Sequence, residues 1–372
     1  MTAVPFVDLR ARLAAIRGEV DAAVARVLDS GWFVLGPEVE AFEAELAAAL
    51  GAREAVAVAN GTEALQLGLL ALGVGPGDEV VTTSMSAAFT ALAVVAVGAR
   101  PVFVDVDPLT LNLDPAAAAR AVTPRTKALL PVHLYGHPAE MEPLVALASE
   151  RGIAIVEDAC QAHGARYRGE AVGTLAGQRG IGAVSFYPTK NLGALGDGGA
   201  VLVNDPDLAA RLRRLRNGGQ ADRYHHELPG INSRLDELQA AVLRVGLKHL
   251  PSWTARRRAI AALYSRELED TGLALPRERE DVSAVFHLYV VRHPRREALM
   301  AALRERGIGT LIHYPIPLHR QGAFAGLGGG EKALPVVEQA AGEILSLPIY
   351  PELTDAQAAT VVTAVRDAAA RL

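Results

Sequence analysis

The residues of this chain best suited to covalent chemistry are one lysine and one aspartate, each of which follows an apolar run. Lys190 comes shortly after residues 183–186, and Asp158 comes directly after residues 153–157. The residues around Lys190 are mostly apolar or small, so its amine loses hydration and its pKa tends to fall. A neutral amine of this kind can form a Schiff base with pyridoxal phosphate (PLP), whose pyridine nitrogen a carboxylate keeps protonated. The pair therefore indicates a PLP site.

Each of these two residues also has a plainer interpretation. A carboxylate at the end of a strand is more often a solvated loop residue than a cofactor ligand, and most lysines lie on the surface. The two are stronger evidence together, because ligands of parallel α/β sheets bind beyond the carboxyl ends of the strands. Asp158 and Lys190 are both expected at that edge.

The tripeptide Asn60-Gly61-Thr62 lies between the apolar run 55–58 and the helical pattern 62–72. Backbone N–H groups and the helix dipole at such a point favour a phosphate. Gly61 lets the backbone come close, and Thr62 can donate its hydroxyl. The alternative is an ordinary helix N-cap. Because the lysine segment indicates PLP, which carries a phosphate, we favour the interpretation of this tripeptide as a phosphate site.

Seven short apolar runs separated by helical patterns predict a mostly parallel α/β sheet flanked by helices. The runs are 55–58, 79–82, 101–104, 128–132, 153–157, 183–186 and 200–203, and the helical segments include 37–50, 62–72 and 140–150. After about residue 250 the pattern changes to the helical segments 256–271, 295–307 and 356–372, with a strand at 286–291 and a loop at 326–330. We therefore predict a large domain over residues 1–250 and a smaller α+β domain over residues 251–372.

Composition narrows the class of protein. The chain has 372 residues, half of them hydrophobic, and a net charge of −5 without an evident basic face, so we expect no nucleic-acid partner. The single cysteine, Cys160, excludes a disulfide within the chain and favours a reducing compartment. Residues 1–12 lack the apolar stretch of a signal peptide, and no apolar run approaches the ~20 residues of a membrane span. We expect a cytoplasmic protein that does not bind membranes.

Several motifs occur along the chain in the same order as in one known family. They are SGWFVLGPEV at 30–39, NGTEAL at 60–65, PVFVDVD at 101–107, EDACQAHG at 157–164, SFYPTKNLG at 185–193 and NSRLDELQAA at 232–241. With them the sequence resembles the DegT/DnrJ/EryC1/StrS sugar aminotransferases, a branch of the fold-type-I PLP enzymes, over nearly its whole length. So many motifs in order are far more specific than one short pattern.

The resemblance implies roles for residues that match the family motifs. Lys190 would be the Schiff-base lysine, which carries the cofactor as an internal aldimine and later shuttles a proton. Asp158 would pair with the pyridinium nitrogen, and Gln161 would lie against the ring near its phenolic oxygen. The phosphate ligands that the resemblance implies are Gly61, Thr62 and Ser185.

Asn232 matches the asparagine that reaches the phosphate from the neighbouring subunit in this family. This match implies a homodimer with shared active sites. The same segment can be interpreted as the start of a helix, in which Ser233 and Asp236 form a pair like a capping box. Both interpretations can hold, because Asn232 lies just before that start.

The sequence departs from the family at the position that covers the cofactor ring. The family usually stacks an aromatic ring or a histidine there, and an ungapped match places Ala87 in that slot. Either Phe89 takes this role through a shifted loop, or smaller groups cover the ring.

Two polar clusters remain as candidates for substrate binding: RYHH at 223–226 and HYPIPLH at 313–319. Their paired histidines lack the cysteine or carboxylate spacing of a metal site, so we expect no metal. The resemblance suggests instead that four of these side chains line a sugar-nucleotide pocket. They are Tyr224, His225, Tyr314 and His319.

The resemblance implies transamination of a nucleotide-linked keto-6-deoxysugar, with dTDP as the expected nucleotide, C3 as the expected position and L-glutamate or L-glutamine as the donor. Two alternatives within the family are amination of a 4-keto sugar and amination of a cyclitol. A third is dehydration of a sugar, but the family members that catalyse it have histidine in place of the lysine, so Lys190 argues against it. A non-catalytic regulator that binds PLP or a nucleotide sugar should have lost Lys190 or Asp158. An NAD enzyme would need G-x-G-x-x-G after the first strand, and the sequence lacks it there.

Overall fold

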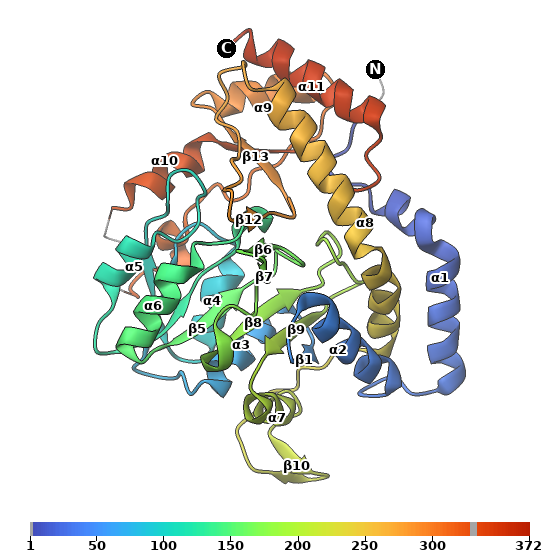
Figure 1. Cartoon of the computed structure of the whole chain (residues 1–372), viewed down its shortest axis with the longest axis vertical. Coiled ribbons are helices and arrows are strands. Elements are labelled where there is room, and N and C mark those ends of the chain that lie inside the picture. Colours follow the sequence, from blue (N-terminus) through green and yellow to red (C-terminus); the bar gives the residue numbers. More distant parts are fainter. Residues whose placement is uncertain (1–2, 328–332) are drawn as a thin grey trace.

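The computed structural model describes residues 3–327 and 333–372, and this part of the chain is built around a sheet of seven strands (Figure 1). The strands are β1 (Glu54–Val58), β2 (Glu79–Thr83), β3 (Arg100–Val104), β4 (Thr126–Leu130), β5 (Ala154–Asp158), β8 (Gly180–Ser185) and β9 (Gly199–Val203). Their order is β1-β9-β8-β5-β4-β2-β3. β9 is antiparallel to β1 and β8, and the other neighbours are parallel. Each predicted run overlaps one strand, so the mostly parallel mixed sheet is confirmed.

Helices cover both faces of the sheet, because successive side chains of a strand point to opposite faces and both sets are apolar here. One face packs against α3 (Gly61–Ala71), α4 (Ala88–Ala96) and α7 (Pro206–Leu215). The other packs against α2 (Pro37–Leu50), α5 (Pro115–Ala121) and α6 (Met141–Arg151). In β9, for example, Val201 joins the first core and Leu202 the second.

A long helix, α8 (Glu237–Glu267), connects the sheet to the C-terminal part of the chain, and α1 (Leu9–Ser30) packs along it (Figure 1). The predicted domain boundary at 250/251 falls inside α8, so the division of the chain at that point stays a prediction. The extreme N-terminal segment belongs with the C-terminal part, since Val4 N donates to Gly307 O and Gly309 N donates to Val4 O.

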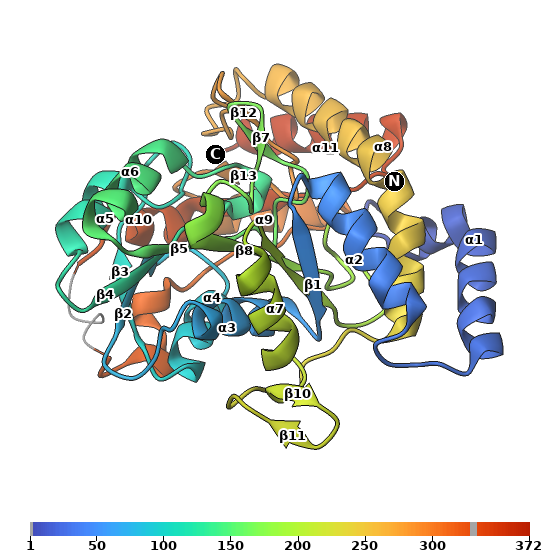
Figure 2. The same cartoon turned by 60° about the horizontal axis from the view of Figure 1, so that its bottom comes forward.

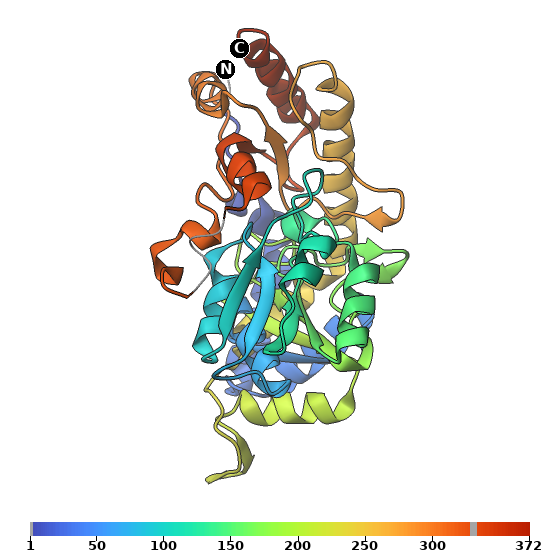
Figure 3. The ribbon, with the colours of Figure 1, turned by 90° about the vertical axis from the view of Figure 1, so that its left-hand side faces the viewer.

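The C-terminal part forms a second core beyond the sheet (Figure 3). Its main elements are β13 (Tyr289–Arg292), α9 (Arg296–Glu305), α10 (Pro335–Glu343), β14 (Ile344–Leu347) and α11 (Asp355–Ala369). Of the predicted loop at 326–330, residues 328–330 lie outside the described residues. The α+β character predicted for this region is present, with β13 and β14 paired antiparallel.

Smaller elements complete the described chain. Three short strands form a separate sheet: β6 (Arg166–Tyr167), β7 (Glu170–Ala171) and β12 (Val282–Ser283). The 3-10 turns are η1 (Leu134–Gly136), η2 (Gly177–Arg179), η3 (Leu318–Arg320) and η4 (Gly322–Phe324). The strands β10 (Gln220–Asp222) and β11 (His225–His226) form a hairpin that projects beyond α7, away from the sheet (Figure 2). Within the described ranges, no helix combines the length and apolar character needed to span a bilayer.

Candidate active site

Lys190 lies in a closed loop that follows β8. The loop is closed because Ala194 N donates to Phe186 O (2.8 Å), and Lys190 N donates to Tyr187 O (2.8 Å) inside it. Gly193 is required there, since a Cβ atom at this position would lie 2.4 Å from the carbonyl oxygen of Pro188. The backbone around the lysine is therefore fixed by short contacts.

Asp158 and the lysine loop lie at the same edge of the sheet, as predicted. Asp158 is the last residue of β5 and pairs in parallel register with Ala183 of β8, whose strand leads into the loop. The Asp158 side chain is buried, and Lys190 is half-buried. Loss of hydration lowers the pKa of Lys190, while the neighbouring Cys160 and Asp158 act in the opposite direction.

A hydroxyl relay at the start of α4 holds the Asp158 carboxylate. Thr90 Oγ1 donates to Asp158 Oδ2 (2.7 Å), and Ser86 Oγ lies 2.8 Å from Thr90 Oγ1. The second oxygen, Oδ1, accepts from Cys160 N at 3.2 Å. Thr90 and Ser86 were not singled out in the sequence. A hydroxyl pair spaced four residues apart after an apolar strand was the available signal, and it is too common to be read alone.

The first turn of α4 also bears on the missing aromatic residue. Ala87 is the N-cap residue of α4 and is half-buried. The Phe89 side chain is 61% exposed, whereas the next residue, Thr90, is buried against Asp158. This orientation does not support Phe89 as the residue that covers the ring. It favours the alternative in which smaller groups do so.

The start of α3 forms a cradle in which only glycine fits. A Cβ atom on Gly61 would lie 2.6 Å from Ser185 Cβ and 3.0 Å from Cys160 Sγ. Asn60 Oδ1 accepts from Glu63 N (2.9 Å), so the N-cap interpretation holds as well. The first N–H groups of a helix have no partner inside the helix. With the Ser185 hydroxyl and the half-buried Thr62 beside them, they provide the donors that a phosphate needs.

Gln161 lies between two tyrosines. Its Oε1 accepts from Tyr135 N (2.8 Å), and its Nε2 donates to the Tyr314 hydroxyl (3.1 Å). The structure thus brings together two predicted site residues, Gln161 and Tyr314. Burial raises the pKa of Tyr314, followed by the effect of the Asp158 charge, so its hydroxyl stays protonated at neutral pH.

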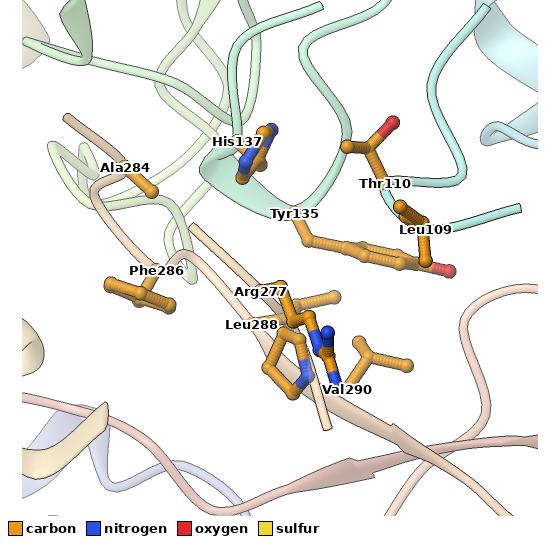
Figure 4. A pocket seen from close by; sticks show the side chains of 10 residues that line it. Leu109, Thr110, Tyr135, His137, Arg277, Ala284, Phe286, Leu288 and Val290 are labelled. Atoms are coloured by element: carbon orange, nitrogen blue, oxygen red, sulfur yellow. The ribbon is translucent and has the colours of Figure 1, made fainter. Parts of the chain in front are cut away.

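A small pocket lies against the Tyr135 ring, between η1 and the segment that leads into β13 (Figure 4). Its walls are mainly apolar, with the Arg277 side chain at one side (Figure 4). No predicted site residue lines it. It is therefore not the predicted cofactor site.

Three predicted residues lie on exposed surface instead. Tyr224 is 80% exposed at the tip of the β10–β11 hairpin, and His225 is exposed beside it. Asn232 is also exposed and forms an isolated antiparallel bridge with Asn217. Within one chain the hairpin projects away from the sheet (Figures 1 and 2), so Tyr224 and His225 do not approach the lysine loop.

His319 is buried, and both of its ring nitrogens are engaged. Nδ1 lies 2.6 Å from Ser84 Oγ, and Nε2 lies 2.8 Å from Glu338 Oε1. The ring thereby links the end of β2 to α10. In this position it joins two parts of the fold, and its contact with a substrate stays a prediction.

The capping pair predicted for Ser233 and Asp236 is wrong. The helix begins at Glu237, Asp236 makes no side-chain cap bond, and Ser233 Oγ accepts from Ala59 N (3.1 Å). Tertiary partners took precedence over the local pattern. The Glu237 carboxylate likewise serves a distant helix: it accepts from three N–H groups at the start of α2, those of Gly36, Glu38 and Val39.

The described side chains include no group of three or more His, Cys, Asp or Glu arranged to hold a metal ion. The candidate site itself brings together a desolvated amine, a buried carboxylate with its hydroxyl relay, and a glycine cradle at a helix start.

Comparison with known proteins identifies the family to which the chain belongs. The family model described as the DegT/DnrJ/EryC1/StrS aminotransferase family matches residues 14–366. The dTDP-3-amino-3,4,6-trideoxy-alpha-D-glucose transaminase of Streptomyces venezuelae is 54% identical over 99% of this chain and 97% of its own.

Solved structures agree with the sequence comparison. The S. venezuelae protein DesV, in complex with a ketimine intermediate, covers 100% of both chains with a TM-score of 0.97 and 53% identity. NtdA of Bacillus subtilis, with bound cofactor PMP, covers 100% of this chain and 86% of its own, with a TM-score of 0.90 and 30% identity. The predicted enzyme class and cofactor are thereby confirmed at the level of the family. The chain belongs to the DegT/DnrJ/EryC1/StrS aminotransferase family and is a PLP-dependent aminotransferase.

Proposed function

We propose that this enzyme transfers the amino group of L-glutamate or L-glutamine to C3 of a dTDP-linked 3-keto-6-deoxyhexose. The observation that carries the proposal is the placement of Lys190 and Asp158 at one sheet edge, beside the Gly61 cradle. The choice of sugar is supported by the relative at 54% identity, whose name specifies a dTDP-3-amino sugar. The single cysteine, Cys160, is compatible with the cytoplasm as the compartment.

The residues at the edge fit PLP, which when bound supplies an electron sink for the bonds around the amino group. Lys190 would attach to it, Asp158 would hold the proton on its pyridine nitrogen, and Gln161 would lie beside its ring. The phosphate would be bound by Gly61, Thr62 and Ser185. Thr90 keeps one lone pair of Asp158 occupied and so fixes the direction of the carboxylate.

Lys190 is also proposed to move the proton. Burial holds its pKa below the ordinary value of 10.5, which increases the share of neutral amine at neutral pH. Its Nζ would remove the proton from the α-carbon of the amino donor in the first half-reaction. In the second it would deliver a proton to C3 of the sugar.

We further propose a homodimer in which each chain contributes to its partner's site. The support is the exposure of Asn232, Tyr224 and His225, which have no cofactor-binding position within their own chain. Large apolar side chains are exposed on the same molecule, among them Trp32 (56%) and Phe33 (48%). Such apolar exposure is expected where another protein surface packs.

The test is a direct product assay. The purified enzyme is incubated with PLP, L-glutamate and a dTDP-3-keto-6-deoxyhexose, and the nucleotide product is examined by mass spectrometry and NMR. The proposal predicts a 3-amino sugar nucleotide and an equal amount of 2-oxoglutarate. Amination only of the matching 4-keto sugar would reject the C3 assignment. Binding of the sugar nucleotide without turnover from any donor would indicate a regulator.

A further inference from the structure

We propose that Arg12 is a positioning residue for Lys190, whose backbone carbonyl its guanidinium holds in place. Arg12 lies in the first turn of α1, 178 residues away in sequence, and its Nη1 donates to Lys190 O at 3.0 Å. The inference rests on the proposed role of Lys190. It adds to that role a residue outside the motifs that identify the family.

Stability alone does not account for this arginine. Its side chain is buried, yet neither Nε nor Nη2 has a hydrogen-bond partner. The nearest carboxylate oxygen, of Glu352, is 3.8 Å from Nε, and the guanidinium lies over the Trp253 ring at 5.2 Å. A buried guanidinium normally satisfies its donors, because an unpaired one is costly. The one hydrogen bond made here goes to the lysine that the chemistry uses.

The residue after Lys190 is held by a different part of the chain. Asn191, the next residue, donates through Nδ2 to Val285 O (3.1 Å), and its Oδ1 lies 3.3 Å from His287 Nδ1. The C-terminal part of the chain thus holds Asn191, while α1 holds Lys190. Of the residues that the structure describes, Arg12 alone donates to the Lys190 carbonyl.

A fixed backbone matters for a lysine that must reach more than one atom. When Nζ is free to move a proton, the side chain has no other anchor than its own Cα. The position of Nζ then depends on how firmly the peptide is held, and a small displacement of a reacting group can cost up to ~100-fold in rate. A displaced Nζ would also meet a different balance of burial and Asp158 charge, and both of these act on the pKa of Lys190.

The test compares Arg12→Met with Arg12→Lys and a control, Arg256→Met, in the PLP-loaded enzyme. Arg256 lies nearby on α8 and donates to the carbonyl of Leu353, not to the lysine loop. For Arg12→Met we expect kcat to fall about tenfold, with KM for the sugar nucleotide unchanged. The pH midpoint of the visible cofactor band should shift from that of the wild type, because the surroundings of the lysine amine change with its position. Arg12→Lys should recover part of both effects, and Arg256→Met should match the wild type.

Unchanged catalysis in Arg12→Met would overturn the inference. If Arg12→Met lowers the melting temperature but leaves kcat and the midpoint unchanged, Arg12 only stabilises the fold and the inference is wrong. If that variant cannot be purified, Arg12→Gln, which is polar but shorter, is judged by the same criteria. A wild type without a cofactor band would reject the proposed function, whereas a normal wild type with an unaffected Arg12→Met would reject this inference alone.

Discussion

The edge of the sheet and the β10–β11 hairpin differ in how complete they are within one chain. At the sheet edge, Lys190, Asp158 and the Gly61 cradle are assembled from strand ends and held by short contacts. On the hairpin, which projects away from the sheet, Tyr224 is 80% exposed. Most of the proposed cofactor site is thus assembled within one chain, and Asn232 is the exception that we propose a partner supplies. In the same proposal, Tyr224 and His225 are completed by a second molecule.

This contrast has a physical origin. Strand ends of a parallel sheet meet because the hydrogen-bond ladder fixes their register. A two-stranded hairpin has no core of its own and is marginal without a partner surface.

The largest effect is expected at the sheet edge. Lys190→Ala should lower turnover by at least about 10⁴-fold, because it removes both the covalent attachment and the proton-transfer group. The melting temperature should change little, since the side chain is half-buried and its amine makes no hydrogen bond to the residues that the structure describes. Lys127→Ala, on an exposed position of β4, is the matched control. Steady-state kinetics decides, and substantial activity in Lys190→Ala would remove the basis of the mechanism.

A smaller loss of turnover is expected when the hydroxyl relay that supports Asp158 is broken. Thr90→Val keeps the shape of the side chain but removes the donor to Asp158 Oδ2. Hydrogen bonds to charged groups contribute about 1.5–3 kcal/mol, so kcat should fall about 10- to 100-fold. Thr363→Val, exposed on α11, is the control. Unchanged kcat and cofactor affinity in Thr90→Val would show that the carboxylate is held well enough without it.

Mixing of two inactive variants tests whether Asn232 contributes to the site of the partner subunit. Lys190→Ala and Asn232→Ala homodimers should each have low activity. If sites are shared, random re-association gives hybrid dimers with one intact site, and activity should rise to about a quarter of the wild-type level. Activity that stays at the average of the two parents would place Asn232 in the site of its own chain.

The smallest effect concerns a buried histidine beside the lysine loop. His163 is 1% exposed, and its ring lies 5.9 Å from that of Phe186. Burial, followed by the Lys190 charge, lowers the pKa of His163 from 6.5 to about 3. Below pH 6.5 the unfolded chain therefore takes up a proton that the folded chain refuses, and the free energy of unfolding falls as the pH falls.

His163→Phe should remove this dependence. At pH 5 the wild-type penalty is about 2 kcal/mol relative to pH 8. Denaturant unfolding at the two pH values should show a difference that is smaller in the variant by about this amount. An equal difference in both proteins would mean that His163 is not kept neutral by the fold.

The fold and the cofactor end could be predicted because their signals are local. Most strands are largely apolar runs, Asp158 ends one of them, and Lys190 lies in the loop that follows another. Contacts between distant segments could not be read in this way. Thr90 reaches Asp158 across 68 residues and Arg12 reaches Lys190 across 178, and neither partner changes the local pattern of the other.

The same limit explains the wrong capping pair. Ser233 and Asp236 have the composition of a helix start, but Ala59 N binds the serine hydroxyl from another part of the fold. The hairpin residues were found through their resemblance to family motifs. Their exposure within one chain was not visible in the sequence, because residue type does not reveal which surface a partner covers.

The most direct test of the central claim is the absorption spectrum of the PLP-loaded protein before and after L-glutamate is added. In the wild type, the visible band should disappear and be replaced by the near-ultraviolet band of pyridoxamine phosphate. In Lys190→Ala the conversion should be slowed by orders of magnitude. Conversion at the wild-type rate in that variant, or a wild-type band that responds to neither glutamate nor glutamine, would contradict the account of Lys190 as the residue that carries the amino transfer.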